Sequence, residues 1–156
     1  MHAAKANGFS LVELMIVIVI FGIMMTLSVP SFSRFLQTWK LHGEVDQMAA
    51  ALRTARSAAV MKNINAVFQF DMNQGNYFYF EDDDRDGTRD SGEYRSAMFA
   101  LTPGIHFDSQ TLGGTVVTFG PKGNTAQSGS ILLENGLEKQ RRVTIFGGTG
   151  NIRTGN

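Results

Sequence analysis

The sequence contains no cysteine, few prolines and no excess of either charge. The absence of cysteine excludes disulfide scaffolds, thiolate metal sites and cysteine nucleophiles. Because 14 basic side chains balance 14 acidic ones, we do not expect a general phosphate-binding surface, which needs a basic excess. Only 3 prolines accompany 17 glycines, and so many glycines predict tight turns and hence β-structure. The 156 residues leave room for one domain and a short additional element.

Histidine is also scarce, and recognisable catalytic motifs are missing. Of the three histidines, His2 lies in the polar start of the chain, while His42 and His106 lie in unrelated segments without an evident nucleophile or acidic partner. The sequence has no P-loop, no dinucleotide-binding fingerprint and no H-E-x-x-H motif. We therefore expect no enzymatic activity.

One long apolar run stands near the start of the chain. Residues 11–29 include fifteen Leu, Ile, Val, Met or Phe side chains. With Phe9 and Ser10 added, the segment makes roughly 31 Å of helix, enough to cross a bilayer core. Residues 1–8 are small or polar, and no small-x-small cleavage pattern follows the run. The segment is thus expected to remain as a transmembrane helix over residues 9–29.

Glu13 is the one acidic residue within this apolar run. A carboxylate there costs roughly 2.5 to 3.5 kcal/mol on insertion scales, so a partner is expected. If the chain were cleaved between Gly8 and Phe9, the new amino group would lie four residues before Glu13, on the same helix face. That amine, or the amine of a neighbouring subunit, would neutralise the carboxylate. The alternative is a carboxylate that reaches the membrane edge.

The segment Gly8-Phe9-Ser10-Leu11-Val12-Glu13-Leu14 resembles the class III signal of type IV pilins and type II secretion pseudopilins. The resemblance implies that a prepilin peptidase cuts after Gly8 and that Phe9 becomes N-methylated. It also implies that Glu13 helps to dock the subunit among other pilin or pseudopilin subunits in a filament. Gly22 and Pro30 fall where pilin helices commonly carry helix-weakening residues.

Residues 30–62 continue as a predicted amphipathic helix. Its apolar residues recur at steps of three and four and define one face, opposite Lys40, Glu44, Asp46, Arg53 and Arg56. For Trp39, anchoring at the membrane interface and packing in the core both remain open. The apolar face consists of Phe32, Phe35, Leu36, Trp39, Val45, Met48, Leu52, Ala55 and Ala59.

Beyond Asn63 the periodicity shifts toward two, which predicts a β-rich domain over residues 63–156. We therefore expect an α+β fold, with the long N-terminal helix packed on an antiparallel β-sheet domain. The order of these elements resembles the family that joins the type II secretion pseudopilin H and the minor pilin FimT. Predicted strands cover residues 66–70, 77–80, 94–99, 105–108, 115–119, 130–133, 142–146 and 152–153.

Residues 82–93 match the calcium-loop template D-x-[DN]-x-[DN]-G-x5-E at every specified position. An apolar stretch precedes the loop where the template has a helix, and Arg85 and Arg89 offer neutralisation without metal. Both a calcium site and a solvated hairpin loop therefore stay open, and calcium would rigidify the loop rather than drive sensor-like opening. The candidate calcium ligands are Asp82, Asp84, Asp86, Thr88, Asp90 and Glu93.

The C-terminal segment raises a DNA-binding alternative. Some FimT-like minor pilins bind DNA through a glycine-arginine-x-arginine stretch, and the corresponding residues here are Gly150-Asn151-Ile152-Arg153. Only Arg153 matches an arginine of that stretch. Strand alternation places the nearby Arg141 and Arg142 on opposite faces, so DNA binding is expected to be weak and salt-dependent.

Together these features predict a single-pass inner-membrane protein with a periplasmic C-terminal domain that joins a filament. A subunit of a type II secretion pseudopilus is favoured over a minor subunit of a type IV pilus. The alternatives are a DNA-binding minor pilin in DNA uptake and a calcium-stabilised pilin-like adhesion or interaction protein.

Overall fold

The computed structural model describes residues 9–156, and its first element is one long helix. Helix α1 spans Leu11–Lys62, 52 residues, and remains helical at Gly22, Pro30 and Gly43. The helix predicted from residue 9 is thus confirmed, with its first turn two residues later. The predicted leader, residues 1–8, lies outside the described residues.

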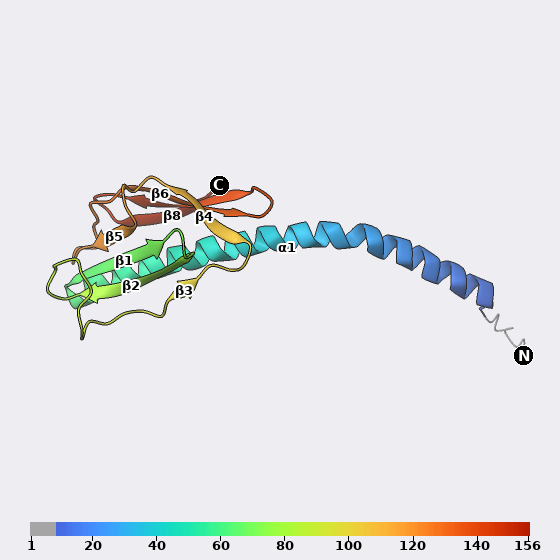
Figure 1. Ribbon diagram of the computed structural model, residues 1–156, viewed down its shortest axis with the longest axis horizontal. Helices are drawn as coiled ribbons and strands as arrows, with labels where there is room; N and C mark the ends of the chain where they lie inside the picture. The colour runs from blue at the N-terminus through green and yellow to red at the C-terminus, as the bar shows by residue number, and fades with distance from the viewer. Residues whose placement is uncertain (1–8) are drawn as a thin grey trace, which may run out of the picture. The chain divides into compact units, whose positions relative to one another are not determined.

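The chain forms two compact units that divide within α1, between Leu36 and Gln37. The second unit, Gln37–Asn156, contains the end of α1 and eight strands arranged in two four-stranded antiparallel sheets (Figure 1). The strand order is β3-β2-β1-β5 in one sheet and β4-β6-β7-β8 in the other. The strands are β1 (Asn65–Asp71), β2 (Asn76–Asp82), β3 (Phe99–Ala100), β4 (Ile105–Gln110), β5 (Val116–Phe119), β6 (Gly129–Asn135), β7 (Gln140–Phe146) and β8 (Asn151–Gly155). The predicted α+β architecture is therefore confirmed.

One hydrophobic core joins the helix to both sheets. Met48 and Leu52 on α1 are fully buried, and each such side chain contributes about 1.5 to 3 kcal/mol when it leaves water. Alternate residues of the strands face the same core, including Phe68 on β1, Ile131 on β6 and Val143 on β7. This alternation is the physical basis for the period of two in the sequence.

The apolar face of α1 is shorter than predicted. Burial begins at Leu41, whereas Phe32 and Phe35 are exposed and Trp39 is 66% exposed. A core position for Trp39 is therefore wrong. Glu44, predicted to lie on the polar face, is instead buried, because its carboxylate accepts hydrogen bonds from the backbone N–H of Thr102 at 3.0 Å and from the Thr102 hydroxyl.

The strand predicted over residues 94–99 is wrong for most of its length. Only Phe99–Ala100 forms a strand, β3. The preceding segment is irregular, but it runs beside β2 and exchanges single backbone bonds with it: Glu81 N donates to Tyr94 O and Ser96 N to Tyr79 O, both at 2.9 Å. The segment therefore satisfies the edge of β2 without forming a regular ladder.

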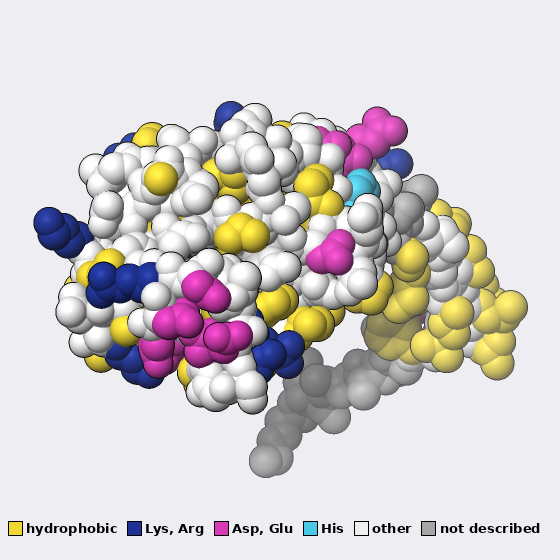
Figure 2. All heavy atoms as spheres, turned by 60° about the vertical axis from the view of Figure 1, so that its left-hand side comes forward, with side chains coloured by type: hydrophobic (Ala, Val, Ile, Leu, Met, Phe, Trp, Pro, Cys, Tyr) yellow, Lys and Arg dark blue, Asp and Glu magenta, His cyan; other side chains and the backbone are white. Residues whose placement is uncertain are grey.

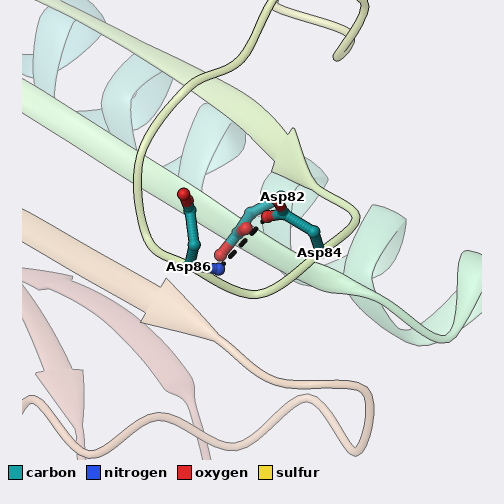
Figure 3. A group of neighbouring side chains, drawn as sticks. All are labelled: Asp82, Asp84 and Asp86. Atoms are coloured by element: carbon teal, nitrogen blue, oxygen red, sulfur yellow. Dashed lines mark hydrogen bonds between the residues drawn. The ribbon is translucent and has the colours of Figure 1, made fainter.

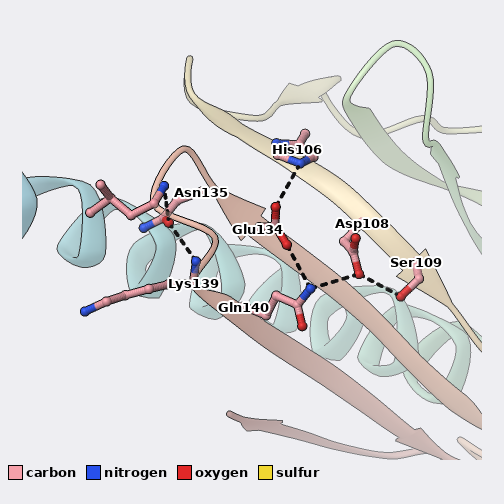
Figure 4. Close-up of polar contacts among 8 residues, drawn as sticks. His106, Asp108, Ser109, Glu134, Asn135, Lys139 and Gln140 are labelled. Atoms are coloured by element: carbon pink, nitrogen blue, oxygen red, sulfur yellow. Dashed lines mark hydrogen bonds and ion pairs between the residues drawn. The ribbon is translucent and has the colours of Figure 1, made fainter.

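Polar contacts tie α1 to turns that are distant in the sequence. Arg56 Nε donates to Gly123 O at 2.8 Å, and its Nη2 donates to Thr149 O at 3.0 Å. Asn135 Nδ2 donates to Gln37 O at 3.3 Å. Its Oδ1 accepts from Lys139 N at 3.1 Å (Figure 4). These contacts fix the loops against the helix that the strands cover.

Candidate functional site

The first candidate region is the surface of α1 within the first unit. From Leu11 to Met25 the large apolar side chains are between 39% and 75% exposed. The most apolar 18-residue window of α1 has a mean hydropathy of 2.5, and none of that window is buried. By length and composition, this helix can cross a membrane.

Ser10 caps the start of this helix. The backbone N–H of Glu13 donates to Ser10 Oγ at 3.2 Å, and Leu14 N donates to Ser10 O at 3.2 Å. The S-x-x-E spacing of Ser10 and Glu13 signals this cap in the sequence. Glu13 is exposed in the first helical turn, where a carboxylate interacts favourably with the helix dipole. Phe9, directly before the cap, is 79% exposed, and Gly8 lies outside the described residues.

The second candidate region is the loop that follows β2. One carboxylate oxygen each from Asp82, Asp84 and Asp86 lies within 4.8 Å of the others (Figure 3). Asp82 is buried, whereas Asp84 and Asp86 are exposed. Burial raises the pKa of the Asp82 carboxyl, and backbone N–H groups of Gly87 and Arg85 oppose that rise. The loop thus gathers three of the predicted ligands around one point.

The other predicted ligands have different neighbours. The Thr88 hydroxyl and N–H both donate to the Asp86 carboxylate at 2.7 Å, which lowers the pKa of Asp86. Glu93 lies outside the group of three aspartates: its Oε1 accepts from Asp83 N and its Oε2 from Asp90 N, both at 2.9 Å. Glu93 therefore closes the loop by joining its beginning to its end.

The third candidate region is strand β8, which carries Arg153. Its guanidinium lies over the ring of Phe146 on β7, 5.5 Å from the ring centroid. Arg142 is exposed, whereas the half-buried Arg141 contacts His42 on α1, with Nη1 2.6 Å from Nδ1. The prediction that Arg141 and Arg142 lie on opposite faces of β7 is confirmed, so they do not form one basic patch.

Family models match two parts of this chain. A family model described as type II transport protein GspH matches residues 44–149, and a prokaryotic N-terminal methylation motif matches residues 3–29. The chain belongs to the GspH family. The predicted family resemblance is thereby confirmed. No curated protein matches this GspH-family chain in sequence.

Solved structures share the fold of this GspH-family chain. The minor pseudopilin EpsH from the type 2 secretion system of Vibrio cholerae is 13% identical, with a TM-score of 0.58 over 74% of this chain and 95% of that chain. The type IV minor pilin FimU of Pseudomonas aeruginosa is 14% identical, with a TM-score of 0.61 over 78% of this chain and 92% of that chain. The fold is therefore that of pilin-like subunits.

Proposed function

We propose that this chain is a minor subunit of a filament, in a type II secretion pseudopilus or a type IV pilus. The observation that carries the proposal is the exposed apolar surface of α1, capped by Ser10 and followed by Glu13, on a chain of the GspH family. An apolar helix with so much exposed surface needs lipid or other helices around it. A bilayer supplies the first environment, and the core of a filament supplies the second.

The same helix suggests how the subunit moves between these environments. Before assembly, residues 9–29 would anchor it in the inner membrane as a single span, with the domain of residues 63–156 in the periplasm. A prepilin peptidase would remove residues 1–8 after Gly8, and N-methylation of Phe9 would follow. Glu13 would then pair with a subunit amine, which lowers the cost of placing a carboxylate among apolar helices.

A polar network lies on the surface of the folded domain. His106 Nε2 lies 3.7 Å from Glu134 Oε1, so the expectation that His106 has no acidic partner is wrong (Figure 4). In the same network Ser109 Oγ donates to Asp108 Oδ2 at 3.0 Å, and Gln140 Nε2 donates to Glu134 at 2.8 Å. This network links β4, β6 and β7 through surface side chains.

Mass spectrometry of the chain purified from cells with and without a prepilin peptidase tests the processing step. With the peptidase, the first residue is expected to be N-methylated Phe9; without it, residues 1–8 remain. A matched pair of variants, Gly8→Trp and Gly22→Ala, separates the cleavage site from a general effect on the helix. An intact N-terminus in peptidase-positive cells would contradict the proposal.

A further inference from the structure

The filament role leaves the loop after β2 without an explanation. This loop carries six carboxylates and two arginines within residues 82–93. In Figure 2 several acidic side chains lie close together at one place on the visible face, and other acidic side chains lie apart from them. Mutual repulsion in such a cluster favours a bound cation, but a solvated acidic loop can tolerate it as well. A second observation is needed to decide between them.

The burial of Asp82 provides that observation. The side chain has 0% exposure, and its Oδ1 has no hydrogen-bond partner among the described residues. The other oxygen, Oδ2, accepts the N–H of Gly87 at 3.2 Å. A buried carboxylate oxygen without a donor is costly, because it has lost its hydrogen bonds to water. A cation bound by the Asp82 carboxylate would compensate for that loss.

Neither arginine of the loop takes this role. Arg85 Nη2 donates to Asn63 O at the end of α1, at 3.2 Å, which draws its guanidinium to the helix terminus. Within residues 9–156, no ion pair joins Arg85 or Arg89 to an acid of the loop. The explanation in which arginines neutralise the aspartates therefore lacks support in the geometry.

The spacing of the oxygens suits one calcium ion. Calcium–oxygen distances are about 2.3 to 2.6 Å, so two ligands of one ion can be up to roughly 5 Å apart. The oxygens of Asp82, Asp84 and Asp86 lie within 4.8 Å of one another. Gly87, with φ at +79°, supplies the sharp turn that wraps the chain around this point. Magnesium is less suitable, because it demands near-ideal octahedral geometry at shorter distances of about 2.0 to 2.1 Å.

We propose that the loop of residues 82–93 binds one calcium ion through Asp82, Asp84 and Asp86. Glu93 positions the loop by holding the N–H groups of Asp83 and Asp90. The ion fixes the loop that covers the end of β2 and thereby stabilises the folded domain by mass action. Because one side of the site is exposed, we expect an affinity typical of extracellular modules, with Kd about 10⁻⁴ to 10⁻³ M.

Calorimetry of the full chain in detergent, freed of metal with a chelator, tests this proposal with calcium chloride as the probe. We expect saturable binding of one ion and a rise in Tm with calcium. Asp84→Asn and Asp86→Asn each remove one charge from an exposed ligand, so the fold is retained and binding weakens at least about tenfold. The matched control, Asp83→Asn, removes the same charge from an exposed position of the same loop outside the group of three, and its Kd stays within about threefold of the original.

Three results would overturn the proposal, with circular dichroism verifying that every variant is folded. The first is a calorimetric titration that shows no saturable heat of binding up to about 10 mM calcium, well above the expected Kd. The second is equal weakening by Asp83→Asn and Asp84→Asn, which would indicate a diffuse charge effect. The third is magnesium binding as tight as calcium binding.

Discussion

The carboxylate of Glu44 on α1 accepts hydrogen bonds from Thr102, a residue 58 positions later in the chain. Glu44 is 6% exposed, and the backbone N–H of Thr102 lies 3.0 Å from its Oε1. Since Thr102 directly precedes the turn into β4, this contact fixes the second sheet against the helix.

Glu44→Ala is expected to destabilise the domain by about 1 to 3 kcal/mol, because it leaves the half-buried N–H of Thr102 without its acceptor. Chemical denaturation of the full chain in detergent measures the free energy of unfolding. Asp46→Ala, at an exposed position of the same helix, is the control and should change it by less than about 0.5 kcal/mol. Equal losses in both variants would show that the contact with Thr102 contributes no stability of its own.

In the turn between β7 and β8, Gly150 is expected to be less replaceable than Gly148. Its φ is +62°, and a Cβ there would collide with the carbonyl oxygen of Gly123, the oxygen that accepts from Arg56. Gly150→Ala should therefore cost about 3 kcal/mol or more, from backbone strain and the clash together. Gly148 has φ at +77° but open space around it, so Gly148→Ala should cost only the strain, about 1 to 2 kcal/mol. Similar Tm losses in both variants would contradict this close approach.

The folded domain is expected to lose stability at high pH, because Lys62 then loses its charge. Its Nζ lies 2.6 Å from Glu81 Oε2, and this hydrogen bond raises the pKa of Lys62 above 10.5, with smaller contributions from the charges of Glu81, Asp83 and Tyr94. A raised lysine pKa gives stability that is full below the unfolded pKa and is lost as pH rises through the folded pKa. Between about pH 10 and 12, Tm should fall more steeply for the original chain than for Lys62→Gln. In Lys122→Gln, the exposed control, the fall should match that of the original chain; parallel curves for all three would refute the prediction.

Arg153 is expected to support little DNA binding. Its guanidinium lies over Phe146, and Arg141 is held by His42, so Arg142 is the exposed arginine that remains nearby on β7. One or two phosphate contacts give weak binding that is lost at physiological salt. In a mobility-shift assay at about 0.15 M salt we expect no shifted DNA. A shift that Arg153→Ala abolishes and Lys122→Ala retains would instead establish the DNA-uptake alternative.

Much of the fold follows from local pattern. The apolar run and the helical period after it predicted α1. All eight predicted strands overlap observed ones, the one over residues 94–99 only at Phe99, because the residues that face the core recur at fixed steps. The segment of residues 94–99 is the exception. Its apolar residues suggest a strand, but most of the segment makes only single backbone bonds to β2.

Two acidic residues, Glu44 and Asp82, are buried although the sequence suggests that they are exposed. Glu44 looks polar and solvent-facing on a helical wheel, yet its partner Thr102 comes from a distant turn that no local pattern reveals. The buried state of Asp82 likewise has no signal in the acidic run of residues 82–86. By contrast, the cap that Ser10 forms with the N–H of Glu13 can be read from the S-x-x-E spacing alone.

The most direct measurement is the recovery of this chain in purified filaments from cells that assemble them, for the original protein and two variants. Glu13→Ala removes the carboxylate but keeps the N–H that donates to Ser10, so the helix cap is retained. Thr26→Ala, the control, removes a hydroxyl that donates to Ile23 O within the same helix. If the chain is a filament subunit that docks through Glu13, the Glu13→Ala chain is expected to stay in the membrane fraction. Its amount in filaments should fall at least about tenfold, which corresponds to about 1.4 kcal/mol. The Thr26→Ala chain should assemble normally. Equal recovery of Glu13→Ala and the original chain would contradict the account.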